Sequence, residues 1–183
     1  HSRRTAAVFI GANDGMLHAF NAANGSELFA YVPNAVFANL AQLTTPSYIH
    51  RPYVDATPAV AEARVGNAWQ TVLVSGMGGG AQGLFALNVS DPASVGTGNV
   101  LWEFTDKDDA DMGNVMSPPQ IVKLFAGKDS DNKPVYKWFA MTGNGLNAND
   151  ADGASNPAAP SVLFIVALDK PAADMREGLL ALA

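Results

Sequence analysis

The sequence predicts an all-β protein: a β-propeller of about three consecutive four-stranded blades belonging to a larger propeller, with a short helical insertion. The first observation is a repeat in which an apolar segment ends in glycine, at Gly11, Gly76 and Gly143, 65 and 67 residues apart. The second is that another apolar segment, closing on Asn or Asp, follows each glycine. Four-stranded units that recur along a chain are typical of propeller blades.

Each predicted blade has four short strands. The first follows a Ser/Thr-Pro step, Thr57-Pro58 or Ser117-Pro118, where proline suits a strand start because it has no N–H to donate. The glycine-ended strand, the apolar strand and an aromatic edge strand come next. The assignment is one partial propeller domain over residues 1–183, with blade one at about 7–32, blade two at about 54–105 and blade three at about 115–183. Blade one lacks its first strand, and the tail of blade three is either a strand or a helical run.

The turn inside blade one is predicted from "VFIGANDGMLHAFN", where Asn13-Asp14-Gly15 separates two apolar runs. Asn, Asp and Gly tolerate positive φ, which a hairpin reversal needs. In the later blades the same turn is expanded into "GMGGGAQG" and "GNGLNANDADGASNPAAP". The repeat is therefore longer than the ~40–50 residues of common propeller repeats because of its loops.

A helical insertion is predicted over residues 33–50, between blades one and two. Apolar residues at Val36, Phe37, Leu40 and Leu43 have helical spacing, and Asn34 is placed to cap the helix, which we expect near residues 34–43.

The composition of the chain disfavours or excludes several classes of function and of site. The net charge of −6 disfavours nucleic-acid binding, and the absence of cysteine excludes disulfides and thiolate metal sites. The longest apolar run, Val162 to Leu168, is far shorter than the ~20 residues of a membrane span. Because no signal peptide opens the sequence and a strand begins almost at once, we interpret the chain as an internal fragment of an exported protein.

Two loops carry candidate calcium ligands, because dense oxygen side chains suit a hard cation. The alternative for both is an ordinary solvated loop in which Asp and Asn form turns. The loop "TDKDDADMGN" lacks the glycine and glutamate of an EF-hand pattern. The candidates are Asp106, Asp108 and Asp111 (with Asp109) in the first loop and Asn147, Asn149 and Asp152 (with Asp150) in the second.

Other chemistry-bearing residues favour structural roles. His18 and His50 have no partners at zinc-ligand or catalytic spacing, so structural hydrogen bonding is expected. The glycine-rich stretch "GMGGGAQG" is followed by a strand and not by a helix, which excludes a phosphate-binding loop. Trp69, Trp102 and Trp138 fall at strand positions, where packing between blades explains them. The stretch "GKDSDNK" predicts a plain hairpin turn between Phe125 and Val135.

Five stretches in succession resemble the C-terminal, quinoprotein-like β-propeller of PilC/PilY-type proteins, which are large surface proteins associated with type IV pili. They cover about residues 7 to 170. The stretches are "FIGANDGMLHAFNAANGSELFAYVP", "YVDATPAV", "VLVSGMGGGAQGLFALNVSDP", "LWEFTDKDDADMGNVMSPPQIV" and "MTGNGLN".

The resemblance implies a non-enzymatic surface protein, without catalytic residues or a resident cofactor in this segment, whose propeller supports pilus assembly, retraction control and adhesion. Its implied partners are pilin subunits and a receptor on host cells or surfaces, and its implied location is the cell surface, the pilus tip or the outer membrane. The family's calcium loop, of the form DxDxDxxxD, matches no stretch here and is expected beyond Ala183.

Two other functions stay open. One is a quinoprotein dehydrogenase that uses pyrroloquinoline quinone and Ca²⁺. The other is a periplasmic scaffold propeller that docks partner proteins.

Overall fold

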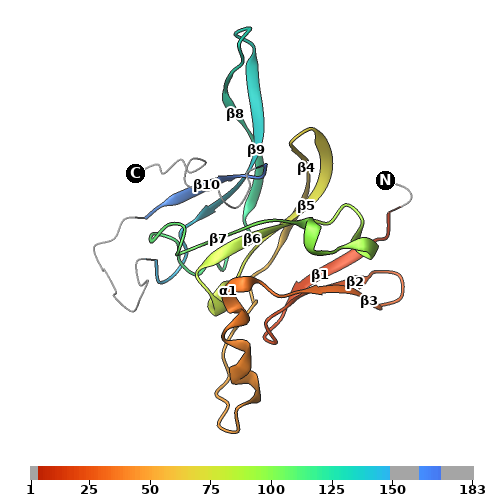
Figure 1. The fold of residues 1–183 in the computed structure, drawn as a ribbon, viewed down its shortest axis with the longest axis vertical. Helices are drawn as coiled ribbons and strands as arrows, with labels where there is room; N and C mark the ends of the chain where they lie inside the picture. Colours follow the sequence, from red (N-terminus) through yellow and green to blue (C-terminus); the bar gives the residue numbers. More distant parts are fainter. Residues whose placement is uncertain (1–3, 149–160, 170–183) are drawn as a thin grey trace.

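A computed structural model describes residues 4–148 and 161–169. The described chain forms three antiparallel sheets and one short α-helix (Figure 1), which confirms the all-β prediction. The sheets have the strand orders β1-β2-β3, β4-β5-β6-β7 and β10-β9-β8. Each sheet is built from consecutive strands joined by hairpins, as in propeller blades.

The first sheet contains β1 (Ala7–Gly11), β2 (Leu17–Asn21) and β3 (Glu27–Tyr31). The Asn13-Asp14-Gly15 stretch is the turn between β1 and β2, as predicted. Of these three residues only Gly15 takes positive φ (94°). Asp14 contributes differently, because its Oδ1 accepts a hydrogen bond from the Met16 N–H at 3.0 Å.

The second sheet contains β4 (Ala59–Val65), β5 (Ala68–Gly76), β6 (Gly83–Asn88) and β7 (Val100–Thr105). β4 begins directly after Pro58, as the Ser/Thr-Pro step predicts. Consecutive residues of β5 and β6 are buried on both sides of the sheet, which is why these strands read as continuous apolar runs rather than alternating patterns.

The third sheet contains β8 (Gln120–Lys128), β9 (Pro134–Gly143) and β10 (Leu163–Ala167). The predicted turn between β8 and β9 is present, with Asn132 at a φ of 62°. Asp129 Oδ1 accepts the N–H groups of Asp131 and Lys133, both at 2.9 Å, so this carboxylate stabilises its own turn. The tail of the predicted blade three, 170–183, lies outside the described residues.

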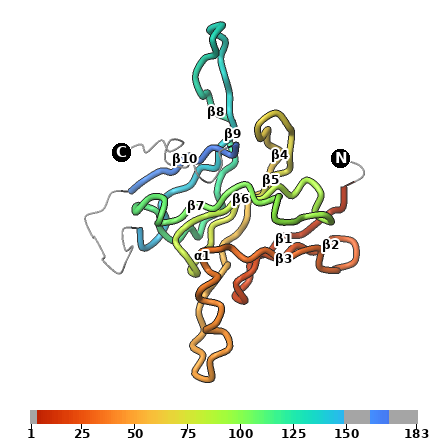
Figure 2. Tube along the Cα trace, viewed as in Figure 1, coloured from red at the N-terminus to blue at the C-terminus, as the bar shows by residue number. Residues whose placement is uncertain are grey.

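The insertion projects away from the sheets, at the end opposite to the β8–β9 hairpin (Figure 2). It holds helix α1 (Asn34–Phe37) and a 3-10 helix (Leu40–Thr44), so the expected helix is divided in two. Asn34 is not the cap: it is the first helical residue, and Pro33 occupies the cap position with no side-chain hydrogen bond. Val36 is buried, whereas Phe37 is exposed.

Three short 3-10 helices occupy two connections of the second sheet: Gly78–Gly80 between β5 and β6, and Pro92–Ser94 and Thr97–Asn99 between β6 and β7. Among the described residues, no helix has the length and apolar character that crossing a membrane would require.

The second sheet is packed between the other two. Leu73, Phe85 and Leu87 belong to a core cluster with Leu17 of the first sheet. The intervening positions of the same strands point to the opposite face, because strand side chains alternate. That face packs against the third sheet in a second cluster that includes Val72, Val74, Leu84, Ala86, Trp102, Phe104, Ala140, Phe164 and Val166. Face-to-face stacking of consecutive sheets is the propeller arrangement, with about 1.5–3 kcal/mol from each fully buried large apolar side chain.

Two of the strand-ending glycines are required by this stacking. A Cβ on Gly11 would lie 2.2 Å from the Val54 carbonyl oxygen, and one on Gly76 would lie 2.0 Å from the Val115 carbonyl oxygen. Val54 and Val115 each lie in the segment that leads into the next blade. The repeated glycine therefore lets this connecting backbone approach the end of the preceding strand.

Candidate functional site

Two carboxylates of the acidic loop after β7, those of Asp108 and Asp109, accept hydrogen bonds within the turns of the loop itself. Asp108 Oδ2 accepts the Thr105 backbone N–H at 2.9 Å and the Thr105 hydroxyl at 3.2 Å. Asp109 Oδ1 accepts the Asp111 N–H at 2.9 Å, and the Asp106 N–H donates to the Gln82 carbonyl. In the described part of the chain, no three His, Cys, Asp or Glu residues converge in a metal-binding group. The calcium assignment to Asp106, Asp108 and Asp111 stays a prediction.

The second candidate loop is described only in part. Asn147 adopts a φ of 54° and donates from Nδ2 to Asn114 Oδ1 at 3.0 Å. Its carbonyl accepts a hydrogen bond from Gln82 Nε2 at 2.6 Å. Asn147 therefore links the second and third sheets. Asn149, Asp150 and Asp152 lie outside the described residues, so the calcium prediction for this loop also stays a prediction.

His18 lies between two carboxylates. Its Nδ1 is 2.6 Å from Glu27 Oε1, and its Nε2 is 2.8 Å from Asp14 Oδ2. The hydrogen bond to Glu27 is the main cause that raises the pKa of His18, and Asp14 adds to it against the opposing effect of burial. This confirms the expected structural hydrogen bonding. His50 lies 3.3 Å from the Tyr48 hydroxyl and 3.5 Å from Asn13 Nδ2.

The glycine-rich loop between β5 and β6 packs against the segment that precedes β4. A Cβ on Gly80 would lie 2.1 Å from the Tyr53 carbonyl oxygen, and one on Gly79 would meet Pro52 at 2.4 Å. Asp55 Oδ1 accepts the Gly79 N–H at 2.8 Å. An anionic side chain thus occupies the N–H that a phosphate would need, and the glycines serve close backbone packing.

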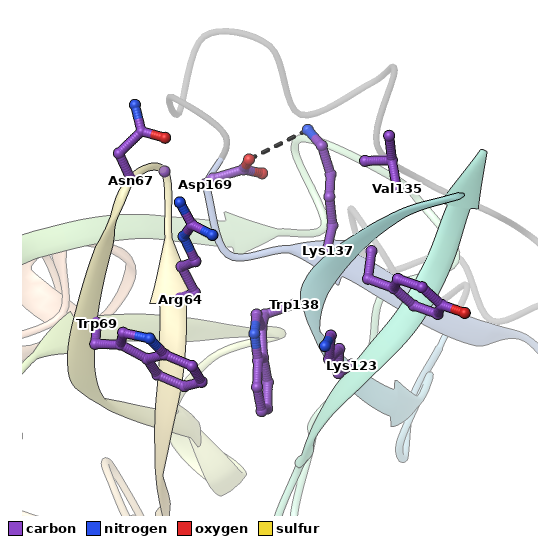
Figure 3. Close-up of a pocket in the computed structure, with 10 residues that line it drawn as sticks. Arg64, Asn67, Trp69, Lys123, Val135, Lys137, Trp138 and Asp169 are labelled. Atoms are coloured by element: carbon purple, nitrogen blue, oxygen red, sulfur yellow. Dashed lines mark hydrogen bonds and ion pairs between the residues drawn. The ribbon is translucent and has the colours of Figure 1, made fainter. Parts of the chain in front are cut away.

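A pocket opens between the β4–β5 and β8–β9 hairpins, with a cavity volume of about 430 Å³ (Figure 3). We call it the inter-hairpin pocket. Trp69 and Trp138 lie side by side on its wall, with ring centres 5.9 Å apart and planes at 71°. Tyr136 lies beside them on β9. Trp69 therefore packs on a tryptophan of the neighbouring sheet, as predicted, but 64% of its surface stays exposed, so this packing covers only part of the residue. Trp102, by contrast, is buried between the second and third sheets.

Each hairpin places a cation directly opposite its tryptophan. Arg64 pairs with Trp69 across β4 and β5, and Lys123 pairs with Trp138 across β8 and β9. Side chains directly opposite one another on antiparallel strands lie on the same side of the sheet. Lys123 Nζ also lies 5.1 Å from the Tyr136 ring centre, at cation–π distance.

The pocket carries a positive balance although the chain has a net charge of −6. Lys137 is paired with Asp169 at 3.1 Å. Within the described residues, neither Arg64 nor Lys123 has a carboxylate partner. Sequence patterns do not predict this site, because its members on the two hairpins lie about 60 residues apart. The available signal was a Trp in the glycine-ended strand of two successive repeats, Trp69 before Gly76 and Trp138 before Gly143.

Comparison with known proteins gives a consistent result. The family model described as the PilY1 beta-propeller domain matches residues 1–176. The Type IV pilus biogenesis factor PilY1 homolog of Xylella fastidiosa (strain Temecula1) is 42% identical over 161 residues, which cover 88% of this chain and 10% of that protein. The Type IV pilus biogenesis factor PilY1 of Pseudomonas aeruginosa (strain UCBPP-PA14) is 41% identical over 155 residues, which cover 83% of this chain and 12% of that protein.

A solved structure is also similar. The crystal structure of the Pseudomonas aeruginosa PilY1 C-terminal domain aligns with a TM-score of 0.65 and 35% sequence identity. The alignment covers 93% of this chain and 30% of the crystallised chain. The chain therefore spans about a tenth of the curated relatives it matches and under a third of the crystallised domain.

Proposed function

This chain belongs to the PilY1 β-propeller family, and from that premise we propose that it is a non-enzymatic part of a type IV pilus biogenesis factor. The observation that carries the proposal is the match of the family model to residues 1–176. The proposed role is that of a propeller platform, exported to the cell surface or pilus tip, which contacts pilin subunits during assembly and retraction. Adhesion to host cells or surfaces is the second part of the role.

The character of the buried polar groups supports a structural rather than catalytic role. Ser75, Asn114 and Thr142 are the buried polar residues among those described. The Ser75 and Thr142 hydroxyls donate to the carbonyls of Gly76 and Gly143, and Asn114 Nδ2 donates to the Gly78 carbonyl at 2.8 Å. All three side chains thus satisfy the carbonyl groups of glycines at or near the ends of β5 and β9. A quinone-dependent dehydrogenase instead needs a carboxylate base and metal ligands directed into a common pocket.

Complementation tests the proposal. A strain that lacks the gene for the protein containing this chain is expected to lose surface pili and twitching, and the intact gene is expected to restore both. The gene without the codons for residues 7–169 is expected to restore neither, although its product is secreted. Normal pili with the deleted gene would overturn the pilus role.

A separate assay tests the non-enzymatic part. The purified protein is mixed with pyrroloquinoline quinone, Ca²⁺ and a primary alcohol, and dye reduction is followed. No turnover above the protein-free rate is expected, and turnover would move the protein to the dehydrogenase class.

A further inference from the structure

The inter-hairpin pocket has an aromatic wall that the packing of the sheets does not require. Trp138 packs partly against the core between the second and third sheets, but Trp69 lies mostly outside it. A large exposed aromatic side chain loses the favourable transfer of its surface from water unless another molecule covers it. The Trp69 ring is therefore available to a ligand with a flat apolar face.

The charged residues at the pocket determine the sign of the charge that the ligand carries. Arg64 and Lys123 flank the two tryptophans, and in the described chain neither is paired with a carboxylate. A guanidinium group matches a carboxylate in bidentate geometry. The complementary ligand is an anion, and a carboxylate suits Arg64 best.

The remaining polar groups suit hydroxyls. The side-chain amide of Asn67 and the Lys137–Asp169 pair lie at the rim above the rings (Figure 3). Together they offer both hydrogen-bond donors and acceptors. A ligand that carries a carboxylate, several hydroxyls and an apolar ring face would use every one of these groups.

We propose that the inter-hairpin pocket binds an acidic saccharide, through a sugar unit that bears a carboxylate. The C–H face of the sugar ring lies on Trp69, because the negative face of an aromatic ring attracts weakly positive hydrogens. The carboxylate pairs with Arg64 and Lys123. The cavity of about 430 Å³ is at the lower end of the ~300–1,000 Å³ range of ligand pockets, so it holds a short segment of a polysaccharide.

An acidic peptide segment is the competing ligand, since it also carries carboxylates. In strand addition, a peptide is held by backbone hydrogen bonds to a strand edge. The lining of this pocket consists instead of side-chain rings and charges, which favours the saccharide over a peptide bound in that way. A peptide also offers no rigid apolar ring face to Trp69 unless it carries a ring of its own.

The inference gives a ligand class to the surface-attachment part of the proposed function. The biological role of this binding rests on the proposed function, whereas the binding itself does not. Pocket binding is measured with purified protein and pilus assembly is measured in cells, so failure of one is distinguished from failure of the other.

The test is a calorimetric titration of the purified protein with trigalacturonate, with its methyl ester and with a short Asp-rich peptide. The ester keeps the shape and removes the charge. Trigalacturonate is expected to bind with a dissociation constant of about 0.1–1 mM, and the ester at least about tenfold more weakly. Binding of trigalacturonate is expected to quench tryptophan fluorescence.

Substitutions locate the binding. Trp69→Ala is expected to weaken trigalacturonate binding about tenfold or more, because it removes the ring on which the sugar face lies. The double variant Arg64→Gln/Lys123→Gln is expected to weaken binding by a similar factor, because it removes both charged partners of the carboxylate. Trp69→Phe keeps an aromatic face and is expected to retain most of the affinity. Lys133→Gln removes a cation from the tip of the same β8–β9 hairpin and is the matched control, with unchanged binding expected.

Three outcomes would overturn the proposal. They are equal affinity for trigalacturonate and its ester, tighter binding of the peptide than of the saccharide, and no binding of trigalacturonate up to about 10 mM. Equal urea midpoints for the wild type and the variants establish that affinity changes do not arise from unfolding.

Discussion

Glu103 on β7 accepts a hydrogen bond from the backbone N–H of Asn34, with 2.7 Å between Oε1 and the nitrogen. The same carboxylate oxygen accepts the hydroxyl of Tyr31, the last residue of β3. Burial and this contact raise the pKa of the Tyr31 hydroxyl. A carboxylate on the second sheet thus caps the helix of the insertion and holds the end of the first sheet.

We expect Glu103→Ala to lower the free energy of unfolding by about 1–3 kcal/mol, because both donors lose their partner. Glu103→Gln keeps an acceptor oxygen and is expected to cost less than half as much. Urea unfolding followed by circular dichroism measures both. Equal losses for the two variants would mean that the acceptor itself contributes little.

Substitution of the strand-ending glycines is expected to affect stability differently in the second and third sheets. Gly76→Ala places a Cβ against the Val115 carbonyl and is expected to cost about 1–3 kcal/mol or more. Gly143 occupies the corresponding position in the third sheet, and a Cβ there would meet none of the described residues within 4 Å. Gly143→Ala is therefore the control, and it is expected to change the free energy of unfolding by about 0.5 kcal/mol or less. Thermal unfolding distinguishes them.

His18 predicts a pH dependence of stability. Its folded pKa is raised by Glu27 and Asp14, so its contribution is complete below about 6.5, the unfolded value, and is lost as the pH rises through the folded pKa. The melting temperature of the wild type is expected to fall from pH 6 to pH 8.5 more than that of His18→Gln. Parallel curves for the two proteins would contradict the assignment.

Phe104 of β7 and Phe164 of β10 pack with ring centres 5.5 Å apart, at the junction of the second and third sheets. A double-mutant cycle with Phe104→Leu and Phe164→Leu is expected to give a coupling energy of about 0.5–1.5 kcal/mol. Leu101 and Phe164 form the matched cycle, in which Leu101 packs at the margin of the same cluster and a smaller coupling is expected. Zero coupling for the first pair would argue against direct packing of the two sheets.

Much of the fold was predictable because short stretches of the sequence determine its turns and strand starts. The Asn13-Asp14-Gly15 turn, the strand start after Pro58 and the β8–β9 hairpin turn each follow from the conformational preferences of a few neighbouring residues. The helix cap was not predictable in this way. Its acceptor, Glu103, lies 69 residues from Asn34 in the sequence, and a pattern around residue 34 contains no sign of it.

The inter-hairpin pocket shows the same limit for function. Arg64 and Trp69 are close in the sequence and can be paired across a hairpin, but their relation to Lys123 and Trp138 depends on how the second and third sheets stack. The calcium candidates illustrate the converse. Asp108 and Asp109 match a ligand-rich composition, yet both accept hydrogen bonds from their own loop.

The sequence alone determined the repeat, the strands, the turns and the resemblance to a pilus-associated propeller, because chain connectivity and residue preference act over a few residues. The tertiary structure alone decided which carbonyl meets which glycine, which carboxylate caps the helix, and which aromatic and cationic side chains share a pocket. Those contacts join residues about 40 to 70 positions apart, and they are set by the packing of one sheet face against the next.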